Sequence, residues 1–155
     1  MSDHGAPAIT LDGAAGLRVT IVAGRWHEEI SEALIAGALR VLDTAGVETS
    51  VIRVPGSFEL PLVCQTALQS GADAVVALGV IIRGGTPHFE YVSAAATQGL
   101  TTVALNTGKP VGFGVLTLDD EAQGMARSGL PGSTEDKGAE AAEAALHTAL
   151  VLRGL

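Results

Sequence analysis

The sequence predicts an α/β protein in which a parallel sheet is covered by helices on both faces. Short apolar runs rich in Val and Ile alternate with longer segments whose apolar residues recur at helical spacing. Parallel strands need crossover connections, and right-handed crossovers place helices on each side of the sheet. Because no repeat, low-complexity stretch or linker divides the sequence, we expect one domain over residues 17–155, preceded by a tail or arm over residues 1–16.

The first expected strand and helix lie at the start of this domain. Leu17–Ala23 is rich in β-branched residues, which is typical of a strand. From Glu28 onward, apolar residues recur at helical spacing through Leu42. An acidic residue suits a helix N-terminus, and Gly46 suits a C-terminal stop.

The second strand and helix follow the same logic. Thr49–Val54 is the expected strand, closed by Pro and Gly. Ser57 is expected to cap the next helix, in which Pro61 lies early enough to be tolerated. Cys64 lies on the apolar stripe of that helix, so we expect a core residue rather than a nucleophile.

The turn after the third expected strand is a candidate anion site. Ala74–Ile82 is a continuous apolar run, which indicates a buried strand, and it is followed by the glycine pair Gly84-Gly85. Thr86 can then cap a helix whose first position is Pro87. Free backbone N–H groups at a helix N-terminus attract anions, and His88 in the first turn can exchange protons near neutral pH. Taken alone, the turn also fits an ordinary strand-to-helix connection.

The remaining elements are read from shorter signals. The helix after Pro87 is expected to run to about Gln98. Further strands are expected at Thr101–Leu105 and Val111–Leu116, and Asp119 or Asp120 is expected to cap a short helix to about Ser128. A long Ala-rich helix is expected to begin near Thr134, since Ser133 and Asp136 have capping-box spacing.

Three expected strand ends bring polar and aromatic residues to one rim of the sheet. Ligands of such sheets bind beyond the carboxyl ends of the strands, near a switch in strand order. Trp26 follows the first strand, Glu59 the second and the Gly85-Thr86 turn the third. Each residue singly has a structural alternative, with Trp26 covering the core and Glu59 capping its helix. Together they favour a ligand that carries a flat ring, hydroxyls and a phosphate.

The composition excludes other classes of function. Hydrophobic residues make up 47% of the chain and the net charge is −8, which argues against nucleic acid and acidic membranes as partners. No apolar stretch reaches the length of a membrane span, so we attribute the apolar surplus to surface buried in an oligomer. A single cysteine and the lack of a leader-like start favour the cytoplasm, and no residue cluster has metal-ligand spacing.

Five segments, in order and at compatible spacing, resemble those of the lumazine synthase family. They are Gly24–Trp26, Val54–Pro61, Gly79–Val92, Gly112–Thr117 and Glu135–Gly138. The resemblance runs from about Leu17 to Leu152. It implies a three-layer αβα sandwich of flavodoxin-like fold around a four-stranded parallel sheet. It also implies a cofactor-free condensation of 5-amino-6-ribitylamino-uracil with 3,4-dihydroxy-2-butanone 4-phosphate, the penultimate step of riboflavin biosynthesis.

The same resemblance implies roles for individual residues. His88 would be the catalytic proton-transfer residue. The phosphate would be held by Gly85 and Thr86, with Arg127 from a neighbouring subunit. Pyrimidine and ribityl contacts would come from Trp26, Ser57, Phe58, Glu59, Val80, Ile81 and Ile82, with Phe113 and Lys137 from that neighbour.

The resemblance also implies a homopentamer whose active sites lie between adjacent subunits. The arm, with Ile9-Thr10-Leu11, would add an edge strand to a neighbour's sheet. Because Gly129–Asp136 is longer than in members that build icosahedral shells, we expect an isolated pentamer. Three alternatives remain: a riboflavin synthase of similar fold, a flavin- or lumazine-binding paralogue without activity, and a purely structural assembly protein.

Overall fold

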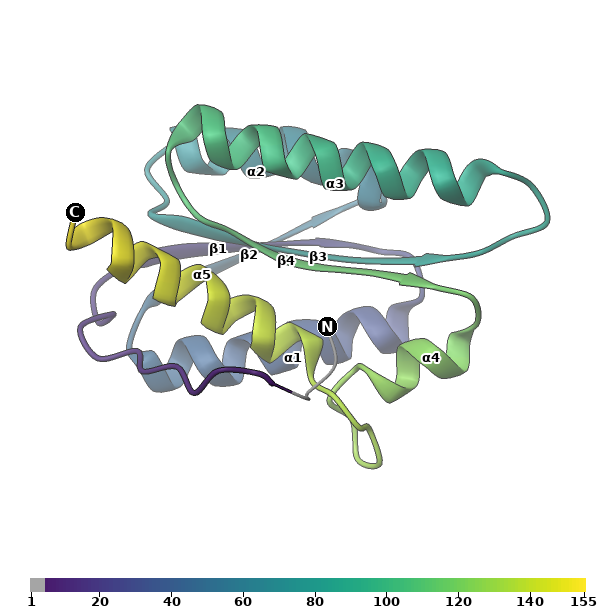
Figure 1. Cartoon of the computed structure of the whole chain (residues 1–155), viewed down its shortest axis with the longest axis horizontal. Helices are drawn as coiled ribbons and strands as arrows, with labels where there is room; N and C mark the ends of the chain where they lie inside the picture. Colours follow the sequence, from purple (N-terminus) through teal and green to yellow (C-terminus); the bar gives the residue numbers. More distant parts are fainter. Residues whose placement is uncertain (1–4) are drawn as a thin grey trace.

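A four-stranded parallel sheet lies between two layers of helices in the computed structural model, which describes residues 5–155 (Figure 1). The first four residues of the expected arm lie outside the described residues. The strands are β1 (Arg18–Gly24), β2 (Glu48–Val54), β3 (Ala74–Ile82) and β4 (Val111–Leu118), in the order β2-β1-β3-β4. The helices α1 (Glu28–Ala45), α4 (Glu121–Ala126) and α5 (Lys137–Arg153) cover one face, and α2 (Leu60–Gln69) and α3 (His88–Thr107) cover the other. The expected αβα class is confirmed.

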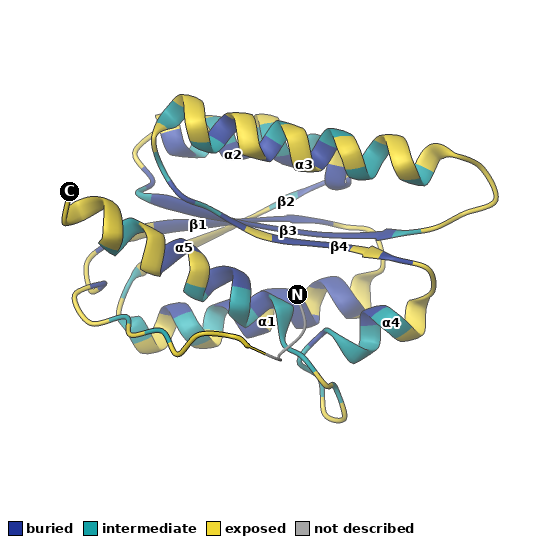
Figure 2. Cartoon of the chain, in the orientation of Figure 1, coloured by how far each residue is buried: buried dark blue, intermediate teal, exposed yellow. Residues whose placement is uncertain are grey.

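The two central strands hold the core, as their continuous apolar sequences predict. β1 and β3 are buried along almost their whole length, whereas the edge strand β2 is largely exposed (Figure 2). Cys64 is a fully buried residue of α2, and burial raises the pKa of its thiol to about 12. The thiol is therefore protonated at neutral pH, which confirms a packing role. No helix among the described residues is long and apolar enough to cross a membrane.

The strand expected at Thr101–Leu105 is wrong, because this segment continues α3. Ala96, Leu100 and Val103 are the buried residues of the helix, and their spacing is helical. Its threonine hydroxyls donate to carbonyl oxygens four residues earlier, as Thr101 does to Thr97 (2.8 Å). A Cβ at Gly99 would lie 2.6 Å from Cγ of Pro61. Gly99 thus allows close packing on α2 rather than ending the helix.

The expected starts of the second and third long helices, α2 and α3, also need correction. Pro87, not Thr86, is the N-cap of α3, and His88 is its first residue. Ser57 begins a 3₁₀ turn (Ser57–Glu59), after which α2 starts at Leu60.

The last helix starts later than expected, because the residues before it form backbone hydrogen bonds to the end of α4. The backbone N–H groups of Thr134 and Glu135 both donate to the carbonyl of Ala126 (2.9 and 3.1 Å). α5 therefore begins at Lys137, and Asp136 caps it by accepting from the Ala139 N–H (3.1 Å). Asp120 caps α4 as expected, with a bond from the Gln123 N–H (2.9 Å).

Candidate active site

A pocket of about 700 Å³ opens at the carboxyl ends of β1 and β3. These two strands flank the switch in strand order, because the chain moves from β1 to one edge and then returns to the other side. The resemblance assigned some site residues to the chain itself and others to a neighbouring subunit. Most of the chain's own set line this pocket: Trp26, Ser57, Phe58, Glu59, Val80, Ile81, Ile82, Thr86 and His88.

One wall is formed by Trp26 packed against the turn after β2. A Cβ at Gly56 would lie 3.0 Å from Cδ1 and 3.1 Å from Nε1 of the indole, so glycine permits this contact. Glu59 holds the same turn, since its Oε2 accepts a hydrogen bond from the Gly56 N–H (2.9 Å). The indole nevertheless remains 67% exposed. It presents an aromatic face on which a planar ring can stack.

The back of the pocket is formed by β3 and the 3₁₀ turn. Ser57 is buried, and a Cβ at Gly79 would lie 2.4 Å from its Oγ, so this glycine makes room for the hydroxyl. Phe58, the next residue, is exposed and also lines the pocket. Val80–Ile82 contribute the end of a strand whose edge is paired with β4. The pocket thus combines buried residues, among them Ser57, Val80 and Ile81, with the exposed aromatic side chains of Trp26 and Phe58.

The glycine turn before α3 is open on its outer side. A Cβ at Gly84 or Gly85 would meet no atom within 4 Å. Gly84 and Thr86 line the pocket, and Gly85 lies between them. His88 follows in the exposed first turn of α3, which runs for 20 residues and directs its positive dipole end toward this space. An anion of phosphate size can therefore approach the turn beside the His88 side chain.

Arg83 fixes the start of this turn. Its Nε donates to Oδ1 of Asp119 (3.0 Å), its Nη1 donates to Oε1 of Glu90 (2.6 Å), and its guanidinium lies 4.3 Å from the centre of the Phe89 ring. Hydrogen bonds to Asp119 and Glu90 raise the pKa of Arg83, and the bond from Arg83 lowers the pKa of Glu90. This ion pair network joins the ends of β3 and β4 to the first turn of α3.

Some pocket residues were not predicted as site residues. His27, Gly56, Phe89, Tyr91 and Val92 also line the pocket. Tyr91 and Val92 lie three and four residues after His88, which is the spacing of one helix face. That spacing is the signal that could have identified them.

Phe113, Arg127 and Lys137 line no part of this pocket. Arg127 donates to the carbonyl of Gln123 (2.9 Å), and Lys137 lies 3.0 Å from Oε2 of Glu135 and donates to Glu140 (2.7 Å). Burial alone lowers the pKa of Lys137, but hydrogen bonds to Glu140 and Glu135 outweigh it and raise the pKa. The ammonium is therefore charged at neutral pH. Phe113 lies in β4, Arg127 directly follows α4 and Lys137 begins α5, and none of the three lines the chain's own pocket.

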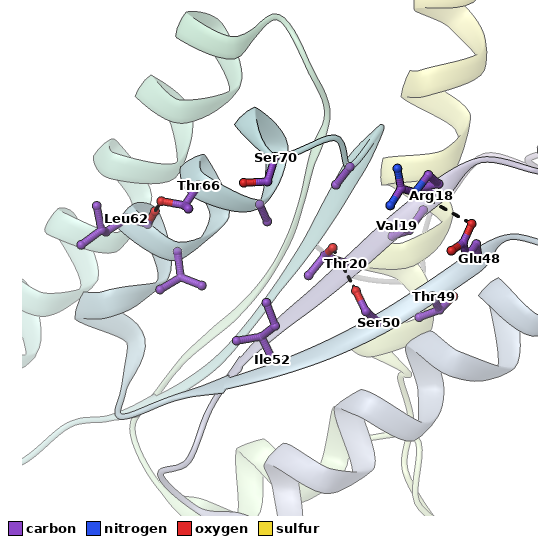
Figure 3. Close-up of a pocket in the computed structure, with 13 residues that line it drawn as sticks. Arg18, Val19, Thr20, Glu48, Thr49, Ser50, Ile52, Leu62, Thr66 and Ser70 are labelled. Atoms are coloured by element: carbon purple, nitrogen blue, oxygen red, sulfur yellow. Dashed lines mark hydrogen bonds and ion pairs between the residues drawn. The ribbon is translucent and has the colours of Figure 1, made fainter.

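A second pocket, of about 590 Å³, lies between α2 and strands β1 and β2 (Figure 3). Leu62 and Thr66 of α2 lie across from Ile52 and Thr20 of the sheet. Its polar contacts include the Thr20–Ser50 hydroxyl pair (3.2 Å) and an exposed ion pair between Arg18 and Glu48 (3.8 Å). The described residues that line it include no His or Cys, so we assign it no catalytic role. Nor do the described residues form a group of three His, Cys, Asp or Glu side chains suited to a metal ion.

Comparison with known proteins gives a consistent result. A family profile described as 6,7-dimethyl-8-ribityllumazine synthase matches residues 16–153. Proteins of that name are similar to this chain over its whole length: 73% identical in Clavibacter michiganensis subsp. michiganensis, covering 98% of that protein, and 74% identical in Leifsonia xyli subsp. xyli, covering 99%. A relative of the same name in Streptomyces avermitilis is 53% identical, with 97% of its length covered. This chain belongs to the 6,7-dimethyl-8-ribityllumazine synthase family.

Proposed function

We propose that this chain condenses 5-amino-6-ribitylamino-uracil with 3,4-dihydroxy-2-butanone 4-phosphate to 6,7-dimethyl-8-ribityllumazine, releasing phosphate and water. The observation that carries the proposal is the pocket in which an exposed Trp26, the Glu59 carboxylate and the open glycine turn before His88 face one space. Family membership supports the same reaction over the rival readings of a non-catalytic paralogue, a related riboflavin synthase or a structural assembly protein.

The substrates would occupy the two ends of the pocket. The pyrimidine would stack on Trp26 and meet the main chain of Val80–Ile82, while its ribityl hydroxyls reach Ser57, Phe58 and Glu59. The phosphate of the second substrate would lie at Gly85 and Thr86, where free N–H groups and the α3 dipole favour an anion. This placement brings the amine of one substrate close to the ketone of the other.

His88 would move the protons of the reaction. The amine condenses with the ketone and releases water, phosphate leaves, and ring closure expels a second water; each step transfers a proton. An imidazole next to the phosphate turn can give and accept protons near neutral pH. Much of the rate enhancement would still come from holding two reactive molecules together, because an amine and a ketone condense readily once positioned.

A neighbouring copy would supply the opposite wall of each site. Phe113, Arg127 and Lys137 lie outside the chain's own pocket, and α4 and α5 cover the sheet face opposite α3. In a ring of chains, such a set can face the pocket of the next subunit. We propose an isolated pentamer, cytoplasmic, with Phe113 closing the ring pocket, Arg127 at the phosphate and Lys137 near the pyrimidine.

The edge strand β2 would receive the N-terminal arm of another copy. Val51 and Ile52 are more than 40% exposed on this edge (43% and 41%), and Leu62 of α2 is exposed beside the second pocket. An unpaired apolar edge favours pairing with a further strand. The arm residues Ile9-Thr10-Leu11 have the composition for that strand.

The reaction is tested by mixing the purified protein with both substrates and following lumazine fluorescence against a protein-free blank. We expect product formation well above the uncatalysed rate. Fluorescence that rises no faster than the blank would contradict the proposal and favour a binding paralogue. A parallel sample with lumazine alone separates the related activity, since riboflavin in that sample would identify a riboflavin synthase.

A further inference from the structure

Arg53 is a partly buried cation behind the pocket for which the proposed reaction has no use. It lies one residue before the end of β2 and does not line the pocket; its side chain is 19% exposed. Its Nη2 donates to the carbonyl of Gly24 (3.0 Å) and to Oγ of Ser31 (3.0 Å), and its Nη1 pairs with Glu32. Arg53 therefore joins β2 to the end of β1 and the start of α1.

The Gly24 carbonyl is held from two sides. The buried Ser31 hydroxyl also donates to it (2.7 Å), so this oxygen accepts two hydrogen bonds, one of them from a charged group. Gly24 is the last residue of β1, and Trp26 is two residues further along the chain. The orientation of this carbonyl sets the direction in which the chain leaves the sheet toward Trp26.

The other end of the turn is also constrained. His27 has φ of +55°, the one described residue other than glycine in the left-handed region. Its carbonyl accepts from the Ser31 N–H (2.9 Å), and the Arg25 N–H donates to Pro55 (3.3 Å). A backbone in this region persists only when its surroundings hold it. Ser31 thus contacts both ends of the turn, and Arg53 holds Ser31 in place.

We infer that Arg53 is a positioning residue for Trp26: through Gly24 and Ser31 it fixes the indole in the orientation that receives the pyrimidine. The inference rests on the proposed function for its ligand. A guanidinium can reach the carbonyl, the hydroxyl and the Glu32 carboxylate at once because its donors form a rigid fork. A lysine ammonium carries the same charge but lacks this fork, so it should replace the arginine only in part.

The test uses the full-length protein and Trp26, its one tryptophan, as an optical reporter. Time-resolved fluorescence anisotropy without substrate measures nanosecond motion of the indole. In Arg53→Met we expect the amplitude of the fast component to rise about twofold, because the hydrogen bonds to Gly24 and Ser31 and the ion pair with Glu32 are all lost. We expect KM for the pyrimidine substrate to rise about tenfold with kcat nearly unchanged, because a less ordered indole binds the ring more weakly. Arg53→Lys should fall between Arg53→Met and the wild type in both readouts.

The matched control is Arg153→Met, which removes another arginine bond to a backbone carbonyl, that of Gly13 (3.0 Å), far from the pocket. It should leave both readouts at their wild-type values. If Arg53→Met only lowers the melting temperature, with wild-type anisotropy and KM, or if both variants change alike, the inference is overturned. If the wild type does not catalyse the reaction but Trp26 loosens only in Arg53→Met, the positioning role stands and the proposed function fails.

Discussion

Gly56 and Gly79 show how residues without side chains shape the candidate site. A Cβ at Gly56 would press on the Trp26 indole at 3.0 Å, and a Cβ at Gly79 would lie 2.4 Å from the Ser57 hydroxyl. Both glycines are needed for close approach, although neither has positive φ. Trp26 and Ser57, two proposed substrate contacts, can therefore take their positions only because Gly56 and Gly79 have no Cβ atom.

Replacing His88 should slow the enzyme without abolishing it. If positioning supplies most of the rate, His88→Ala loses only proton transfer, and kcat should fall about a hundredfold, the low end of general acid–base effects. Steady-state kinetics measure this fall. His147, exposed on α5, provides the control, and His147→Ala should match the wild type. A His88→Ala protein with no detectable turnover would contradict the positioning argument.

Replacing Arg127 should mainly weaken the binding of the phosphate substrate. Arg127 is the proposed phosphate ligand from the neighbour, and loss of one charged hydrogen bond should raise KM for the butanone phosphate about tenfold. KM for the pyrimidine should change little. Initial rates at varied concentrations of each substrate separate the two effects, with Arg153→Ala as the control. Equal rises in both KM values would argue against a phosphate contact.

At the scale of elements, the close contact between α2 and α3 depends on Gly99. In Gly99→Ala the new Cβ would lie 2.6 and 2.9 Å from Cγ and Cβ of Pro61, within the ring rather than at a flexible tip. We expect a loss of about 1–3 kcal/mol from overpacking, which exceeds the gain of about 1 kcal/mol or less in helix propensity. The midpoint of urea unfolding at fixed protein concentration measures the difference.

Thr102→Ala provides the control for Gly99→Ala, because Thr102 is exposed on the same helix. It should change the unfolding midpoint little. A Gly99→Ala protein as stable as the wild type would show that the two helices can separate at low cost.

The elements best predicted from sequence are those in which local pattern and burial agree. Ala74–Ile82 is a strand with the predicted bounds because a central parallel strand is apolar on both sides. Thr101–Leu105 has β-branched residues but lies in a helix, because Leu100 and Val103 are buried in the core at helical spacing. The threonine hydroxyls bond to carbonyl oxygens of the preceding turn. That outcome depends on tertiary contacts, among them Gly99 against Pro61, which a local pattern does not contain.

The candidate site could be predicted in outline because parallel strands end at one edge. Trp26, Glu59 and Thr86 follow three different strands, and they share one pocket. The left-handed backbone of His27 and the Arg53 network were not predicted, because both arise from contacts between β2, β1 and α1. Residues far apart in the sequence meet there, and no spacing within one segment reveals them.

At the scale of the whole molecule, the placement of the proposed site residues and the exposed apolar side chains both fit active sites shared between neighbouring chains. Trp26 and His88 line the pocket, whereas Arg127, which follows α4, and Lys137, which begins α5, do not. Large apolar side chains remain exposed: Ile52 and Leu62 by the second pocket, Val51 on the edge strand β2 and Phe113 on the other edge strand, β4. Neighbouring copies would cover these faces and complete each site.

Complementation between two damaged chains tests the shared site most directly. Trp26→Ala damages the proposed pocket wall, and Arg127→Ala damages the wall proposed to come from the neighbour. In a ring assembled from equal amounts of both chains, about a quarter of the sites should combine an intact pocket with an intact neighbouring wall. The measurement is the turnover of co-expressed, purified mixed assemblies at low substrate concentration, beside each variant alone. We predict recovery toward a quarter of the wild-type rate; turnover no greater than the average of the two variants would contradict a site shared between chains.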